Sequence, residues 1–415
     1  MELSDVKSWQ EAEDARLEYE GYCNKIRQGL EKLDDKSGER ALWELVQNAR
    51  DMSKEARIKI ELTQDRIIFS HHGKPFDYTS FRALVKQDSS KDRNADDQVG
   101  QYGTGFMTTH AFNRKVYVSG PFVVKVKDNV LGYVQIENFE LDRTDVDTAE
   151  GPNKMKEQLS EVKEFNNKNP LSNEIKDDTT SFHYHLTPEQ VIEVSTQLSN
   201  AIRLMPFVLV INTRIKEMEI YNHHTNEHFT LKKTDEYNHT AIGQDGWKEV
   251  TETILRKYNN TDASDTYTCK SLQSDKGDVV IIPPFPEACG NVSEIPSIFL
   301  WFPLLGTEAF GINFIYHSKR FYPVEERNNI MLPGSTIMKR EKGGNNNAVL
   351  KEMTEALFKY YSIDYNAKTL AQNMCEVSFP QNSEDKETQK FFLEMQLLWI
   401  TTIPNWKVLP VGDNH

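Results

Sequence analysis

The chain has 415 residues and a mass of 48.0 kDa, which is long enough for two or three domains. Its formal net charge of -14 argues against a broad nucleic-acid-binding surface and leaves room only for a local basic patch. The N-terminus is charged, and no apolar run reaches the length of about 18 residues that a membrane span needs, so we expect a cytoplasmic protein. The four cysteines are widely spaced and lack CxxC pairs, which argues against a zinc ribbon and predicts free structural thiols.

Two helices and a hairpin open the predicted fold. Apolar residues recur every three or four positions over residues 14–33, and a second helix is expected at about 39–54. Alternating apolar residues over 56–69 predict a β-hairpin, and the polar stretch 86–99 predicts a loop. The glycine-rich segment "GQYGTGF" and a short helix follow that loop.

Strands and helices alternate through the rest of the sequence, which predicts an α/β fold. The expected elements are two or three strands within 115–139, a charged insertion at 145–178 that is helical near 154–165, a strand at 179–186, a helix that stops near Pro206, a strand pair over 208–221, further strands up to 333, and two amphipathic helices near 347–361 and 386–399. We expect domains at 1–207, 208–335 and 336–415.

Three polar side chains share one face of the second predicted helix. Glu44, Asn48 and Asp51 are spaced i, i+4 and i+7, which places them within roughly 60° of one another around the helix axis. A solvated helix face would show the same pattern. As a functional site, Asn48 could hold Mg²⁺, Glu44 could take a proton from water, and Asp51 could hold a second water or a lid residue.

A second candidate feature is the GxxGxG spacing of Gly100, Gly103 and Gly105, directly before a predicted helix. Residues without side chains let backbone N–H groups approach phosphate oxygens, and a helix N-terminus favours negative charge. The alternative is a glycine-rich turn that only caps the helix. No apolar parallel strand precedes the glycines and no GxxxxGK[ST] motif is present, so neither a dinucleotide fingerprint nor a P-loop is predicted.

The order of these motifs resembles the GHKL superfamily, which includes the ATPases of gyrase, the 90-kDa heat-shock chaperone, histidine kinases and MutL. The matching succession is a helix with ExxxNxxD, a hairpin that ends in "SHHGKPF", a polar loop and GxxGxGF. "WELVQNARD", "HHGKPF" and the downstream "FPLLGTEAFGINFIYHSKRFYPVEERNNIML" look like sacsin-type, chaperone-like ATPases. The intact Glu44 and the lack of an acceptor-histidine helix distinguish the chain from most histidine kinases.

The resemblance implies a Bergerat α/β sandwich, which is a mixed sheet with helices on one face, followed by a transducer-like α/β domain. It also implies an enzyme that hydrolyses ATP with Mg²⁺, closes a lid at about 80–105, dimerises on ATP binding and acts on a macromolecular partner. Chaperoning, DNA-linked remodelling and bacterial defence are all open as its setting. The implied nucleotide contacts are Gly73, Gly100, Gly103, Thr104, Gly105 and Phe106.

A basic residue of the second domain reaches the γ-phosphate in the family, and Lys319, Arg320 and Arg327 are the candidates here. Ordinary surface charges are the alternative interpretation of these three residues. Thr179 or Thr180 resembles the family's threonine near adenine.

The chain departs from the family at His71, where an aspartate normally accepts a hydrogen bond from the adenine amino group. A neutral imidazole accepts one hydrogen bond through its unprotonated nitrogen, so His71, a water or a backbone carbonyl could replace the aspartate. The missing aspartate and the acidic insertion also motivate a rival interpretation, a nucleotide-gated scaffold with little or no hydrolysis. A protein kinase with the same fold is a third, disfavoured one.

Overall fold

The computed structural model describes residues 3–87, 105–168, 170–242, 246–283, 285–291, 294–363, 379 and 385–402. The chain forms two compact units. Unit 1 comprises Met1–Ala201, Arg214–Thr230 and Tyr258–Thr261, and unit 2 comprises Ile202–Thr213, Leu231–Lys257 and Asp262–His415. The domain bounds predicted from the sequence stay a prediction.

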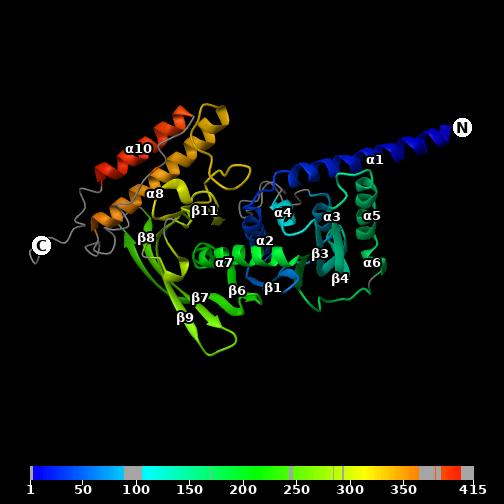
Figure 1. Cartoon of the computed structure of the whole chain (residues 1–415), viewed down its shortest axis with the longest axis horizontal. Helices are drawn as coiled ribbons and strands as arrows, with labels where there is room; N and C mark the ends of the chain where they lie inside the picture. Colours follow the sequence, from blue (N-terminus) through cyan, green and yellow to red (C-terminus); the bar gives the residue numbers. More distant parts are fainter. Residues whose placement is uncertain are drawn as a thin grey trace, which may run out of the picture. The chain divides into compact units, whose positions relative to one another are not determined.

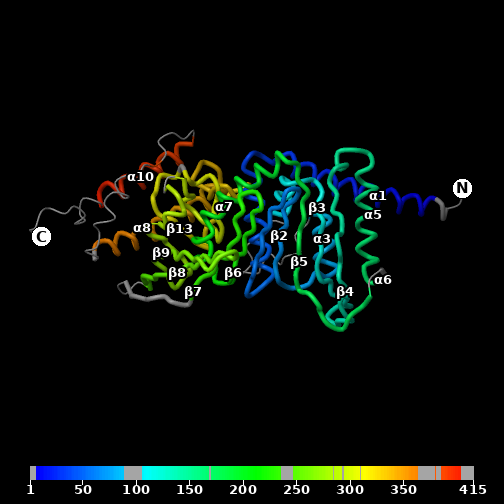
Figure 2. The backbone as a smooth tube through the Cα atoms, turned by 60° about the horizontal axis from the view of Figure 1, so that its bottom comes forward, coloured from blue at the N-terminus to red at the C-terminus, as the bar shows by residue number. Residues whose placement is uncertain are grey.

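A mixed sheet forms the centre of unit 1, with the strand order β6-β1-β2-β5-β3-β4. The strand β1 pairs in parallel with β6 and antiparallel with β2, and the remaining neighbours are antiparallel. Figure 2 shows β2, β5, β3 and β4 following one another across the unit. The strands are β1 (Ala56–Leu62), β2 (Arg66–His72), β3 (Lys115–Val126), β4 (Asn129–Asp142), β5 (Thr179–His185) and β6 (Ile215–Asn222).

One face of this sheet is buried and the other is partly open. Ile60, Phe69 and Phe182 are cross-strand neighbours on β1, β2 and β5, and all three side chains are buried. The residues between them along each strand, such as Lys59 and Ser181, are only partly buried. Side chains alternate between the two faces of a sheet, so the buried positions all lie on one face. The helices cover this face only. The predicted α/β class, with helices on one face of a mixed sheet, is confirmed.

The helices of unit 1 are α1 (Leu3–Leu30), α2 (Ser37–Met52), α3 (Tyr78–Lys86), α4 (Gly105–Thr108), α5 (Gly151–Lys163) and α6 (Phe165–Lys168). Helix α1 begins well before the predicted start at residue 14 and extends past the other elements of the unit (Figure 1). Residues 6–18 of this helix are mostly exposed and rich in charge, and the ion pairs Arg16–Glu13 and Arg16–Glu20 link successive turns in its middle. Apolar periodicity cannot reveal such a helix.

The predicted helix stop at Pro206 and the predicted strand at 208–211 are both wrong, because helix α7 runs from Pro188 to Ile211. The residues around the proline, including Leu204, Phe207 and Val208, are buried, so their packing offsets the hydrogen bond that the proline ring removes. A short apolar run cannot by itself distinguish a buried helix from a strand. Among the described residues, α7 alone is long and apolar enough to span a membrane, but 72% of its apolar window is buried inside the protein, as in a core helix.

Unit 2 combines a sheet with two C-terminal helices. Its strand order is β12-β11-β13-β10-β9-β8-β7, and the predicted C-terminal helices are confirmed as α8 (Gly344–Ile363) and α10 (Lys386–Thr402), which lie side by side (Figure 1). Val280 and Ile298 of the strands share one core with Leu357 and Trp399 of the helices. The strands, of which β7 and β8 lie mainly in unit 2, are β7 (Glu227–Ile242), β8 (Trp247–Tyr258), β9 (Ser264–Ser274), β10 (Val279–Ile282), β11 (Ile298–Leu300), β12 (Phe302–Pro303) and β13 (Ile315–His317).

The three cysteines that the structure describes are free, as the sequence predicts. Cys23, Cys269 and Cys289 are buried and unpaired with one another, and Cys375 lies outside the described residues. Burial raises the pKa of Cys289 to about 12, so its thiol stays protonated and unreactive at neutral pH.

Candidate nucleotide site

The predicted polar face of α2 borders the core of unit 1. Between residues 41 and 50 every side chain is buried except those of Glu44 and Asn48, which are partly exposed. The two residues are one helical turn apart and therefore point to the same side. Their carboxylate and amide groups are thus the partly exposed groups of an otherwise buried stretch of helix, which is unlike a fully solvated helix face.

The carboxylate of Glu44 lies against Gly105, the first residue of α4. A Cβ atom placed on Gly105 would lie 2.0 Å from Glu44 Oε2 and 2.8 Å from Glu44 Cδ. No side chain larger than hydrogen fits at this position without moving the carboxylate. The structure therefore brings together two predicted parts of the site that are far apart in the sequence, whereas Gly100, Gly103 and Thr104 lie outside the described residues.

Asp51 forms a buried ion pair at the end of α2. Its Oδ1 atom is 3.0 Å from Nη1 of Arg50, and the two side chains are 1% and 3% exposed. The sequence analysis did not anticipate this pairing with the preceding residue. The predicted role of Asp51 in holding a second water or a lid residue stays a prediction.

His71 and Thr180 are direct cross-strand neighbours on β2 and β5. Both are buried, and cross-strand neighbours point to the same face of a sheet. Thr180, and not the partly exposed Thr179, therefore lies beside the imidazole. Its hydroxyl also lies close to β3, because a Cβ atom on Gly120 would be 2.9 Å from Thr180 Oγ1.

The imidazole of His71 is neutral at pH 7. Burial lowers its pKa to about 4, because a charged ring would lose its hydration. Its Nδ1 atom is 3.4 Å from the carbonyl oxygen of His72, and a carbonyl oxygen can only accept a hydrogen bond. A proton on Nδ1 fits this contact and would leave Nε2 as a hydrogen-bond acceptor, while adenine recognition by His71 stays a prediction.

The turn after β2 is held between α2 and β5. The backbone N–H of Lys74 donates to the carbonyl of Met52 at 3.0 Å, and that of Gly73 donates to the carbonyl of Asp178 at 3.4 Å. A Cβ atom on Gly73 would lie 3.1 Å from the Met52 oxygen, so a glycine allows this close approach. The Asp178 carboxylate also pairs with His72 Nδ1 at 2.7 Å. The sequence analysis missed Asp178, although an acidic residue directly before a strand that pairs with β2 is a usable signal.

Phe106 packs into the core beside these residues. Its side chain is 9% exposed and its ring centroid is 5.3 Å from that of Phe182, which in turn is 6.4 Å from the ring of His71. The side chain of Phe106 thus supports the wall behind the site. A direct contact between Phe106 and a nucleotide stays a prediction.

The three basic candidates lie in unit 2 and have different surroundings. Arg320 Nη2 is 2.5 Å from Asp278 Oδ2, and Arg320 Nη1 is 2.8 Å from Glu352 Oε2. The Asp278 side chain is fully buried, so Arg320 neutralises a carboxylate inside unit 2. Lys319 is exposed and Arg327 is partly exposed. A contact between any of the three and a γ-phosphate stays a prediction.

The available metal ligands are few. Across the ranges that the structure describes, no three His, Cys, Asp or Glu side chains gather closely enough to hold a metal ion by themselves. This arrangement is compatible with Mg²⁺, which binds proteins through one or two oxygen ligands and completes its octahedron with phosphates and water. The Asn48 amide oxygen is of this chemical kind, and its contact with Mg²⁺ stays a prediction.

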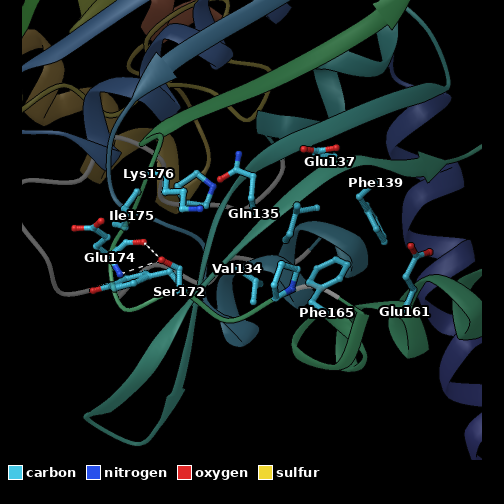
Figure 3. Close-up of a pocket in the computed structure, with 14 residues that line it drawn as sticks. Val134, Gln135, Glu137, Phe139, Glu161, Phe165, Ser172, Glu174, Ile175 and Lys176 are labelled. Carbon is cyan, nitrogen blue, oxygen red and sulfur yellow. Dashed lines mark hydrogen bonds between the residues drawn. The ribbon is translucent and has the colours of Figure 1, made fainter.

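Two cavities in unit 1 are separate from these residues. One has a volume of about 400 Å³ and lies between β4 and residues 170–176 (Figure 3). The other has a volume of about 540 Å³ and is lined by residues of β3, α5 and the start of α3. Neither is lined by Glu44, Asn48 or His71.

No protein-family model matches the chain, and no curated protein sequence matches it. Among solved structures, it is similar to the ATP-binding domain of topoisomerase IV from Francisella tularensis, with 13% identity and a TM-score of 0.26 over 51% of this chain and 57% of that one. It is also similar to the B-subunit of DNA gyrase from Myxococcus xanthus, with 6% identity and a TM-score of 0.37 over 80% of this chain and 93% of that one.

The chain thus spans less than two thirds of the length of that topoisomerase IV domain. The sacsin-type branch stays a prediction.

Proposed function

We propose that the protein is a Mg²⁺-dependent ATPase of the GHKL type, acting in the cytoplasm on a macromolecular partner. The observation that carries this proposal is the contact between the Glu44 carboxylate and Gly105, with Asn48 one turn along the same helix. A general base, a metal ligand and the beginning of a helix that follows glycines are the three parts needed beside a triphosphate.

Each residue then has a defined task. Glu44 accepts the proton of the water that attacks the γ-phosphorus, and backbone N–H groups near Gly105 bind phosphate oxygens. Asn48 orients Mg²⁺ through its amide oxygen, and the metal neutralises charge that develops on the phosphates. His71 accepts a hydrogen bond from the adenine amino group through Nε2, with Thr180 beside it, while Lys319, Arg320 or Arg327 supplies positive charge to the γ-phosphate.

Phosphoryl transfer to water needs positioning and electrostatics more than covalent chemistry. The close approach of Glu44 to Gly105 supports such positioning, since both groups are fixed by helices packed in the same core. Lid closure over the nucleotide and ATP-dependent dimerisation would couple hydrolysis to the partner. Chaperoning, DNA-linked remodelling and bacterial defence are settings in which such coupling is used.

One observation favours a second candidate function, a nucleotide-gated scaffold with little or no hydrolysis. His71 replaces an aspartate, and its single acceptor nitrogen provides one hydrogen bond where a carboxylate provides more. A protein that binds adenine loosely would bind ATP weakly and turn it over slowly.

Isothermal titration calorimetry of the whole chain with ATP, ADP and ATP without Mg²⁺ separates the two functions. The ATPase proposal predicts saturable binding of ATP that strengthens with Mg²⁺, together with release of inorganic phosphate. Binding of ATP without release of phosphate would exclude the ATPase and favour the scaffold, and a lack of affinity for every nucleotide would exclude both. Transfer of labelled γ-phosphate to protein would instead identify a kinase.

A further inference from the structure

The edge strand of unit 1 borders a cavity. Strand β4 ends the strand order and pairs only with β3 along its length. On its other side an isolated antiparallel bridge joins Tyr133 to Ser172, which places Pro170 toward Gln135, and a space of about 400 Å³ lies between β4 and residues 170–176. We call this space the β4 groove; Figure 3 shows the residues that line it.

The backbone of Gln135 faces into the β4 groove. Tyr133 and Ser172 exchange two backbone hydrogen bonds of 2.8 Å each, so the polar backbone groups of Tyr133 point away from β3. The N–H and C=O groups of every second residue in a strand point to the same side, and the register between Val123↔Tyr133 and Pro121↔Gln135 is unbroken. The backbone N–H and C=O of Gln135 therefore point away from β3, as those of Tyr133 do.

Pro121 provides an independent argument for this direction. It lies opposite Gln135 and has no N–H to donate, while its carbonyl accepts a hydrogen bond of 2.9 Å from Phe76 on the side away from β4. Pro121 and Gln135 are thus opposite each other without a backbone hydrogen bond between them. Within the described residues, the N–H and C=O of Gln135 have no backbone partner on the groove side.

The groove carries negative charge. Glu137, Glu161 and Glu174 line it and form no ion pair among the described residues, against a single Lys176. Val134, Ile136 and Phe165 provide buried apolar surface beside these carboxylates. Unpaired backbone groups, apolar surface and exposed carboxylates together are what an added strand with basic side chains would contact.

We propose that the β4 groove binds an extended, Lys- or Arg-bearing segment of a partner protein as an additional strand. The segment pairs with the backbone of Gln135 and places basic side chains beside Glu137, Glu161 and Glu174. A second copy of the chain is disfavoured as the occupant, since pairing two β4 edges would bring these carboxylates toward one another. Asn138, at φ 52°, interrupts the regular pairing of β4 just after Glu137 and limits the contact to a short segment.

Fluorescence anisotropy of the full chain tests this proposal with a labelled ten-residue peptide of alternating Lys and Thr. An acidic peptide of alternating Glu and Thr is the charge control. The basic peptide is expected to bind saturably and the acidic one not to bind. Failure of the basic peptide to bind at millimolar concentration would overturn the proposal, as would equal binding of both peptides.

Two further measurements separate strand addition from general attraction to an acidic protein. The substitution Gln135→Pro removes the outward N–H without removing a bond to β3, and is expected to weaken binding by about tenfold, whereas Gln135→Ala leaves it unchanged. Thermal melting of both variants checks that they fold. Should Gln135→Pro fail to fold, a basic peptide methylated at alternate backbone nitrogens tests the same bonds on the unaltered protein.

Equal affinity of the methylated and unmethylated peptides, or full binding by Gln135→Pro, would show that strand pairing is absent and would overturn the proposal. Concentration-dependent self-association that Gln135→Pro abolishes would assign the groove to a second copy and also overturn it. Peptide binding does not depend on ATP hydrolysis, so failure of peptide binding and failure of the ATPase proposal can be distinguished.

Discussion

The narrow space between Gly105 and Glu44 makes Gly105→Ala a sharp perturbation of the proposed site. A new Cβ atom would lie 2.0 Å from Glu44 Oε2, whereas carbon and its non-bonded neighbours are comfortable at about 3.5 Å. The carboxylate must therefore move by more than about 1 Å. The obstacle is the far end of a flexible side chain, so the fold can accommodate the methyl group.

The expected effect is a loss of turnover without a loss of stability. A displacement of about 1 Å at a reacting group costs on the order of 10²-fold in rate, and we expect this decrease in kcat for ATP. Gly105 is the first residue of α4 and does not have a positive φ, so alanine is not strained there. Replacing glycine by alanine in a helix changes stability by about 1 kcal/mol at most, in the stabilising direction.

Gly21→Ala is the matched control, because Gly21 lies in α1 and a Cβ atom there meets nothing within 4 Å. Steady-state release of inorganic phosphate and thermal melting should be measured for wild type and both variants. Wild-type turnover in a folded Gly105→Ala protein would refute the assignment of Glu44 as a base beside the glycine motif. Equal losses in both variants would show that the effect is not specific to the site.

Other expectations concern pH, packing and the metal. The folded-state pKa of His71 of about 4 lies below its unfolded value of about 6.5, so the unfolded state binds more protons between these values and the free energy of unfolding falls as the pH drops through that window. Wild-type protein should lose free energy of unfolding between pH 7 and pH 5, and urea titrations should show that His71→Gln removes about 2 kcal/mol of that loss. The substitution His224→Gln, at an exposed histidine, is the control and should not remove it. Identical pH profiles of wild type and His71→Gln would contradict the burial of the His71 ring. Arg320→Ala leaves the Asp278 carboxylate buried and without this partner, so unfolding should become easier by about 3 kcal/mol, measured by urea titration; an unchanged urea midpoint would count against the network. In calorimetry, Asn48→Ala should weaken Mg·ATP binding roughly ten- to hundredfold, since a contact to a charged group contributes about 1.5–3 kcal/mol, and should leave ATP binding without Mg²⁺ unchanged; equal losses in both titrations would argue against a metal ligand.

Strong periodicity made most of unit 1 predictable. The hairpin β1–β2 alternates buried and exposed residues over its full length, and α2 shows a helical apolar pattern, so both were found from the sequence alone. Helix α3 was missed, because no element was predicted between the hairpin and the loop at 86–99. Its capping box, in which Asp77 and Ser80 bond each other's backbone, was a usable signal.

The chemistry of the site was only partly predictable, because it depends on contacts between segments far apart in sequence. Spacing placed Glu44 and Asn48 on one helix face, but no sequence rule gives the contact of Glu44 with Gly105. The neutral state of His71 follows from burial between strands, which the pattern "SHHG" does not reveal. Arg320 shows the same limit, since its buried partner Asp278 lies on a different part of the chain.

The central claim is that Glu44 activates water for ATP hydrolysis, and a comparison of wild type with Glu44→Ala tests it most directly. Single-turnover hydrolysis of Mg·ATP should be measured on protein whose ATP affinity has been determined by calorimetry. The variant should bind ATP with an affinity close to that of wild type and hydrolyse it about 10²- to 10⁴-fold more slowly, which is the usual contribution of a general base. Turnover that Glu44→Ala leaves unchanged would contradict the claim.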